Sequence, residues 1–215
     1  MLSIALFLLF TTTASAVTPL EGKIIALDAG HGNGETGAVG YCGVTKVVEA
    51  DVNQAVRAEL KILLETDNAV VHEVIPYPSR QDRVADAEDA GSDVLISIHH
   101  NGSTNTSADY TQSFVTQKND KILAGFIQPA LVDALKLPDK GIKSDGYGMT
   151  VYGSLPGILT ESYFVTNTVA ACDFVDYLNE VTNTRVQKEA QAMYNGLLNY
   201  FSRSTDGSGG GRPNR

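Results

Sequence analysis

Short apolar runs recur along the chain and predict buried strands. Nearly continuous runs fall at 23–28, 69–75, 94–98 and 157–160, and a shorter run falls at 114–115. The run at 94–98 has almost no polar interruption, which is typical of a central parallel strand that is covered on both faces. Because the runs are four to seven residues long, they suit strands better than helices.

Between these runs, apolar residues return every three or four positions, which is the helical period. This pattern predicts helices at 48–64, 79–90, 122–135 and 186–201. Pro129 lies inside the third helix, where we expect a kink or an interruption. The alternation of strands and helices predicts a single α/β domain with a twisted, mostly parallel sheet flanked by helices.

The two ends of the chain differ from this pattern. An apolar run from Leu2 to Phe10 and then Ala14-Ser15-Ala16 predict a signal peptide over 1–16, although no Lys or Arg precedes the run. A buried first strand or a short anchor is the alternative. We therefore expect a secreted or periplasmic protein with a catalytic domain over 17–202. The Gly/Ser/Arg-rich segment 203–215 is expected to be a disordered tail.

Composition narrows the class of partner. The 215 residues carry a formal net charge of −9, so a broad basic surface for nucleic acid is not expected. No later stretch is apolar enough for stable membrane insertion after cleavage, and nothing indicates an oligomeric state. The two cysteines, Cys42 and Cys172, are too few for a disulfide framework, but export would permit one bridge between them.

Polar side chains at three predicted strand ends are candidates for chemistry. His31 follows the first strand, His99 follows the central strand and Glu161 follows the late strand. Because parallel strands end at the same edge of a sheet, where ligands gather, we expect these side chains to lie together. Two imidazoles and a carboxylate form the ligand set of many catalytic zinc sites, which keep a fourth position for water.

Zinc hydrolysis needs a second carboxylate in another role, as a base that the metal does not occupy. Glu49, Glu161 and several Asp residues can each supply the liganding carboxylate, and their spacing alone does not say which does. His72 and His100 are not expected to be ligands. His72 lies inside the second strand, and His100 is adjacent to His99, so its side chain should point elsewhere.

Four ordered motifs resemble those of the zinc-dependent N-acetylmuramoyl-L-alanine amidases. They are IALDAGHG at 25–32, EADVN at 49–53, SDVLISIHHN at 92–101, and PGILTE followed by FVTN within 156–167. Arg83 matches an arginine that precedes the third motif. The resemblance covers 23–201, and four motifs in the right order are far more specific than any one of them.

The resemblance implies zinc bound by His31, Glu49 and His99, with Glu161 as general base and acid and Arg83 in support. It implies hydrolysis of the amide bond between the lactyl group of N-acetylmuramic acid and L-alanine in peptidoglycan. The chain departs from the family where Ser162-Tyr163-Phe164 replaces a glycine-containing sequence, and where Glu88 stands in place of an asparagine. These departures concern the substrate groove more than the metal ligands.

Two other functions compete with this interpretation. One is an exported zinc peptidase that cuts ordinary peptide bonds, and the other is a non-catalytic module that binds the cell wall. The stretch 101–156 is accounted for by one strand, one helix and a loop, which leaves little room for an inhibitory helix. We therefore expect a bare catalytic domain that is active without an activator.

Overall fold

The computed structural model describes residues 18–144 and 148–203. The predicted signal peptide over 1–16, the start of the predicted catalytic domain at Val17 and the predicted tail over 203–215, apart from Arg203, lie outside the described residues. In the part that is described, no helix is both long and apolar enough to cross a membrane.

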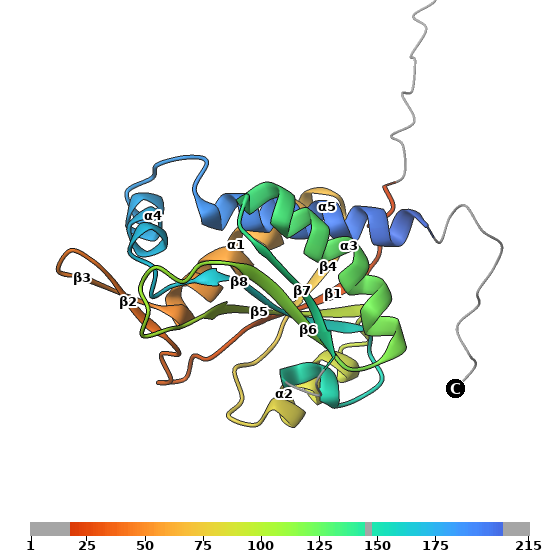
Figure 1. Cartoon of the computed structure of the whole chain (residues 1–215). Helices are drawn as coiled ribbons and strands as arrows, with labels where there is room; N and C mark the ends of the chain where they lie inside the picture. The colour runs from red at the N-terminus through yellow and green to blue at the C-terminus, as the bar shows by residue number, and fades with distance from the viewer. Residues whose placement is uncertain (1–17, 145–147, 204–215) are drawn as a thin grey trace, which may run out of the picture.

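A six-stranded sheet forms the centre of the fold, with the order β4-β1-β5-β8-β6-β7 (Figure 1). All neighbouring strands run parallel except β6 and β8, which are antiparallel. The predicted mostly parallel α/β architecture is confirmed. The strands are β1 (Ile24–Ala29), β4 (Val70–Glu73), β5 (Val94–Asn101), β6 (Thr111–Val115), β7 (Asp139–Ser144) and β8 (Gly157–Phe164).

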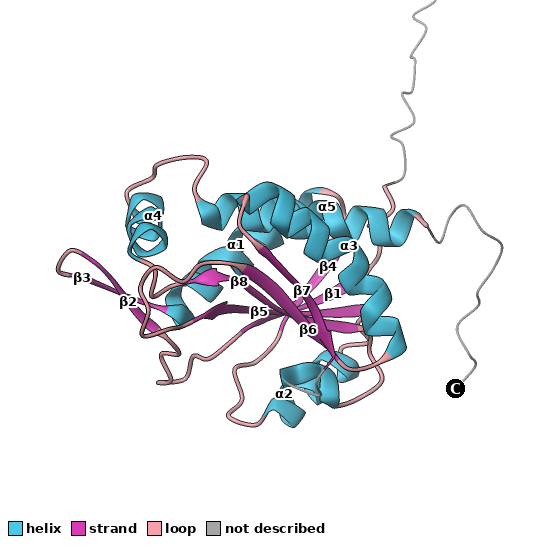
Figure 2. Cartoon of the chain, viewed as in Figure 1, coloured by secondary structure: helices cyan, strands magenta, loops and turns pink. Residues whose placement is uncertain are grey.

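Helices cover both faces of this sheet, as Figure 2 shows. Leu27 and Ile96 pack under the layer of α1, α3 and α5, whereas Ala26 and Leu95 pack on Val84 of α2. Successive residues of β1 and β5 therefore enter opposite cores, which explains why these strands are apolar without a break. The helices are α1 (Glu49–Thr66), α2 (Arg80–Asp89), α3 (Lys118–Leu135), α4 (Thr168–Leu178), α5 (Arg185–Ser202) and the short 3-10 helix η1 (Gly148–Val151).

Several elements were not predicted. The segment between the first predicted strand and the first predicted helix contains a hairpin of β2 (Val39–Cys42) and β3 (Thr45–Val48), joined by the two-residue turn Gly43-Val44. Gly43 has φ +60°, a conformation that glycine adopts easily and that such turns require. α4 was also absent from the prediction. So were β7 and η1, and these two lie within 101–156, which therefore holds more than one strand, one helix and a loop.

Two expectations about elements need correction. Of the two alternatives at Pro129, the interruption is wrong, because α3 continues through that residue. Both Pro129 and Gly125 are exposed, so water can satisfy the Gly125 carbonyl that proline leaves without its helical donor. His99 and Glu161 lie inside β5 and β8 rather than beyond them, because pairing between these strands continues past the apolar runs.

The β2–β3 hairpin is fixed to the rest of the fold by a disulfide. Cys42 at the end of β2 is bonded to Cys172 of α4, with 4.7 Å between their Cα atoms. This settles the pairing that the sequence left open. The backbone of the hairpin also approaches the chain closely at Gly40, where an added Cβ would lie 1.8 Å from the Val165 carbonyl oxygen.

Candidate active site

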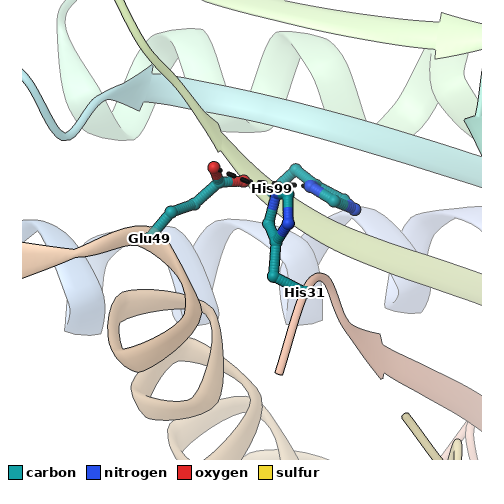
Figure 3. A group of neighbouring side chains, drawn as sticks. All are labelled: His31, Glu49 and His99. Atoms are coloured by element: carbon teal, nitrogen blue, oxygen red, sulfur yellow. Dashed lines mark hydrogen bonds and ion pairs between the residues drawn. The ribbon is translucent and has the colours of Figure 1, made fainter. Parts of the chain in front are cut away.

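Three side chains from separate elements meet at one edge of the sheet. His31 lies two residues after β1, Glu49 is the first residue of α1, and His99 lies near the end of β5 (Figure 3). One ligand atom from each lies within 4.8 Å of the others, and among the described residues these three alone form such a group of His, Cys, Asp or Glu. The structure therefore brings together His31 and His99, which the sequence places at two predicted strand ends.

Glu49 joins the two imidazoles. Its Oε2 lies 3.1 Å from His31 Nε2, and its Oε1 lies 2.9 Å from His99 Nδ1. Oε2 also accepts a hydrogen bond from the Ala38 backbone N–H, at 2.9 Å. Because Glu49 is almost completely buried, these contacts fix the carboxylate group in one orientation. The geometry thus favours Glu49, rather than Glu161, as the carboxylate beside the imidazoles.

Two glycines leave the space that this group occupies. A Cβ on Gly30 would lie 2.2 Å from the His99 ring, and a Cβ on Gly37 would lie 2.5 Å from Glu49 Oε2. His31 itself has φ +64°, a conformation that is uncommon for a residue with a side chain. The glycine-rich character of this loop is therefore required by the close packing of the three side chains.

The charges in the group stabilise one another. Burial alone would raise the pKa of Glu49, but hydrogen bonds from His31 and His99 outweigh burial and hold that pKa far below its ordinary value. The hydrogen bond to Glu49 in turn raises the pKa of His31. An ionised carboxylate between two imidazoles is a donor set that a divalent cation such as zinc can bind.

Glu161 lies beside this group in a different environment. It is paired with His99 in the register of β5 and β8. Its Oε2 is buried and has no hydrogen-bond partner among the residues that the structure describes. Burial, followed by the negative charges of Glu49 and Glu189, raises the pKa of Glu161 well above its ordinary value. A carboxyl group with these properties suits proton transfer.

Arg83 supports the loop that carries His31. Its Nη2 donates to the His31 carbonyl at 2.8 Å, and its Nη1 donates to Asp28 Oδ1 at 2.9 Å. The other oxygen of Asp28 accepts from Ser97 Oγ at 2.7 Å, so Asp28 connects β5 to α2 through Arg83. Arg83 thus contacts the loop that carries His31 through the backbone of that loop.

The other two described histidines lie outside the group. His72 pairs with Asp86 at 2.8 Å. His100 is buried and contacts Asn53 and Glu189. Sequence reasoning did not identify Glu189, although a signal exists: it is a charged residue at the helical spacing of the apolar face of α5.

A cavity of about 440 Å³ opens onto the group. Its walls include His31, Glu49, His99 and Glu161, together with Arg80 of α2 and Met149 of η1. The cluster and the buried carboxyl group of Glu161 therefore face the same space. This arrangement places a candidate metal site and a candidate proton-transfer group in one cavity.

Comparison with known proteins agrees with the motifs. The family model described as N-acetylmuramoyl-L-alanine amidase matches residues 25–199. The chain belongs to this family. The amidase domain is 34% identical to YqiI of Bacillus subtilis, an uncharacterized protein, and this match covers 87% of the chain and 89% of YqiI.

Two further proteins that are similar to this chain are named as N-acetylmuramoyl-L-alanine amidases. LytC of Bacillus subtilis, an N-acetylmuramoyl-L-alanine amidase, is 30% identical over 192 residues, which cover 85% of this chain but only 36% of LytC. The catalytic domain of the amidase CwlV from Bacillus (Paenibacillus) polymyxa superposes with a TM-score of 0.74 at 23% identity. That match covers 84% of this chain and 98% of CwlV's domain, and it supports the fold.

Proposed function

We propose that this amidase is a secreted zinc hydrolase that cleaves the amide bond between the lactyl group of N-acetylmuramic acid and L-alanine in peptidoglycan. The observation that carries the proposal is the meeting of His31, Glu49 and His99 beside the buried carboxyl group of Glu161 in one cavity. Membership of the N-acetylmuramoyl-L-alanine amidase family and the similarity to the amidase LytC support the choice of substrate. The apolar leader and Ala14-Ser15-Ala16 support export.

The residues present fit a zinc ion. Two imidazoles and one carboxylate are a recognised set of ligands for catalytic zinc, and Gly30 and Gly37 leave the room that the set needs. His31, Glu49 and His99 would hold the ion. When bound there, zinc lowers the pKa of water and polarises a carbonyl group.

Glu161 supplies the proton transfers. Its Oε2 takes a proton from the water that attacks the lactyl carbonyl, and it returns a proton to the departing nitrogen of L-alanine. The raised pKa of Glu161 favours the second transfer, because the carboxyl group keeps its proton until the amine leaves. The carbon–nitrogen bond breaks, water supplies the new carboxylate oxygen, and no other reactant is consumed.

Digestion of purified peptidoglycan by the zinc-loaded protein tests the proposal. The expected products, identified by mass spectrometry, are glycan strands with free lactyl groups and peptides that begin with L-alanine. No second protein should be required. Glycan that keeps its stem peptides while the peptides are shortened would instead show the zinc peptidase, and an inert protein that still binds walls would show the binding module.

Variants distinguish the proposed role of Glu49 as a metal ligand from the proposed role of Glu161 as a base. Glu161→Gln should keep zinc and lower kcat by about 10²–10⁴-fold, because it preserves size but removes the base. Glu49→Ala, His31→Ala and His99→Ala should each lose zinc. His72→Ala is the matched control, since His72 pairs with Asp86 away from the group. If Glu161→Gln loses metal and Glu49→Ala keeps it, the two carboxylates have been assigned the wrong way round.

A further inference from the structure

A continuous chain of hydrogen bonds runs through the core behind the site. Ser162 Oγ donates to Glu189 Oε1 at 2.6 Å, and Glu189 Oε2 lies 2.8 Å from His100 Nε2. His100 Nδ1 lies 2.7 Å from Asn53 Oδ1, and Asn53 Nδ2 donates to the Gly30 carbonyl at 2.9 Å. The chain therefore joins β8, α5, β5, α1 and the loop after β1.

On β5 and β8, the chain of hydrogen bonds includes the residues that directly follow two residues of the site. His100 follows His99 on β5, and Ser162 follows Glu161 on β8. His99 and Glu161 are directly paired between those strands, where the register then shifts. A single carboxylate, that of Glu189, contacts both neighbours. Its position thus bears on the spacing between the metal ligand and the proton-transfer group.

At its other end, the chain of hydrogen bonds reaches the surroundings of the remaining two candidate ligands, Glu49 and His31. Asn53 lies one helical turn after Glu49 on α1, and it holds the carbonyl of Gly30, the residue before His31. The backbone N–H of His100 donates to Glu49 Oε1 at 3.1 Å. All three candidate metal ligands and Glu161 are thus next to, or one helical turn from, a member of the chain.

Stability alone does not account for a carboxylate at this place. The side chains of Glu189 and His100 are both completely buried. Apolar side chains of similar volume generally stabilise a core as well as buried ionic pairs do. Groups that hold ligands in orientation, in contrast, must be polar and must have definite partners. Glu189 meets both conditions: it is polar, and its partners are Ser162 and His100.

We propose that Glu189 is a positioning residue, which through His100 and Ser162 holds the metal ligands and Glu161 in their relative places. This inference rests on the proposed function. Glu189 is completely buried and is not among the residues that line the cavity, so a substrate held in that cavity would not contact it. Its loss should therefore alter metal binding and turnover and leave KM unchanged.

Glu189→Leu removes both hydrogen bonds and approximately preserves volume. We expect a folded protein that binds one zinc per chain, with zinc affinity and kcat each lowered by about 10- to 100-fold. The visible spectrum of the cobalt-substituted protein should also change, because it reports ligand geometry. Glu189→Gln can still accept from Ser162 and donate to His100, so it should restore most of each property.

Glu59→Leu is the matched control. Glu59 accepts a hydrogen bond from the Tyr177 hydroxyl at 3.0 Å, which joins α1 to α4 outside the hydrogen-bonded chain. Its removal should leave the cobalt spectrum, zinc affinity and kcat unchanged. His100→Gln should keep one zinc per chain and lower kcat. The double variant with Glu189→Leu should lose little more than either single variant, because both interrupt the same chain.

An unchanged cobalt spectrum, zinc affinity and kcat in folded Glu189→Leu would overturn the inference, as would a Glu189→Gln that is as impaired as Glu189→Leu. If Glu189→Leu does not fold, Ser162→Ala replaces it, because this variant removes only one of the two contacts of Glu189. Its cobalt spectrum should show the same change at smaller size. An unchanged spectrum in Ser162→Ala would also overturn the inference. Zinc affinity and the cobalt spectrum are read without substrate. A wild-type protein without amidase activity would contradict the proposed function and leave this test intact.

Discussion

At the scale of single residues, the site depends on a glycine, because there is no room for a Cβ atom beside one of the candidate ligands. Gly30 lies under the His99 ring, where a Cβ would come within 2.2 Å of ring atoms. That distance is far shorter than a van der Waals contact, so the imidazole would have to move. His99 cannot move freely, because its Nδ1 is held 2.9 Å from Glu49 Oε1.

We therefore expect Gly30→Ala to fold but to lose most of its affinity for zinc, as measured by competition with a chelator. Gly125→Ala is the matched control: nothing lies within 4 Å of an added Cβ there, and the residue is inside α3. That substitution should leave zinc binding unchanged and raise the free energy of unfolding by about 1 kcal/mol. Equal zinc affinity in both variants would show that the space at Gly30 is not needed.

Residue chemistry was partly predictable from the sequence. His31, His99 and Glu161 were found because each follows an apolar run, and the ends of parallel strands converge. The pattern did not separate Glu49 from Glu161, because their roles depend on burial and on contacts across the sheet. The family resemblance proposed the assignment, and the geometry now favours it.

At the scale of elements, the β2–β3 hairpin has a direct bearing on the site. β3 ends at Val48, and α1 begins with Glu49, so the hairpin leads straight into a candidate ligand. The disulfide between Cys42 and Cys172 ties this hairpin to α4 across 130 residues of sequence. Such a long loop restricts the unfolded chain strongly.

Replacing both cysteines, as in Cys42→Ser with Cys172→Ser, should lower the free energy of unfolding by about 2–4 kcal/mol. Urea unfolding measures this loss, and the wild-type protein in a reducing buffer should show the same midpoint as the double variant. Zinc content should stay at one per chain, because neither cysteine belongs to the metal group. A reduced wild type that is as stable as the oxidised protein would contradict a stabilising disulfide.

The elements that escaped prediction have recognisable reasons. β7 is almost entirely exposed and polar, so it has no apolar alternation to reveal it. The hairpin is short and contains Gly40, which favours the interpretation as a loop. α4 has a signal in the sequence, because Asn167, a favoured N-cap residue, precedes an apolar stretch. In the structure Asn167 does cap the helix, accepting from the backbone N–H groups of Val169 and Ala170.

At the scale of the whole molecule, the sequence predicted the class of fold but not the order of strands. Apolar runs identify strands, but they do not say which strands are neighbours, and the position of β5 between β1 and β8 is visible only in the structure. That order is what brings His99 beside Glu161. The antiparallel pairing of β6 with β8 was likewise outside the reach of local patterns.

The net charge of −9 should affect how readily the protein approaches an insoluble substrate. Stem peptides carry carboxylates, so peptidoglycan should repel the protein over a distance of about 30 Å at 0.01 M salt and about 8 Å at 0.15 M. We expect hydrolysis of insoluble peptidoglycan to become faster as salt rises over this range. Cleavage of a small soluble muropeptide, which carries few charges, should change much less. A rate on insoluble walls that falls with salt would show instead that local basic groups attract the wall and outweigh the net charge.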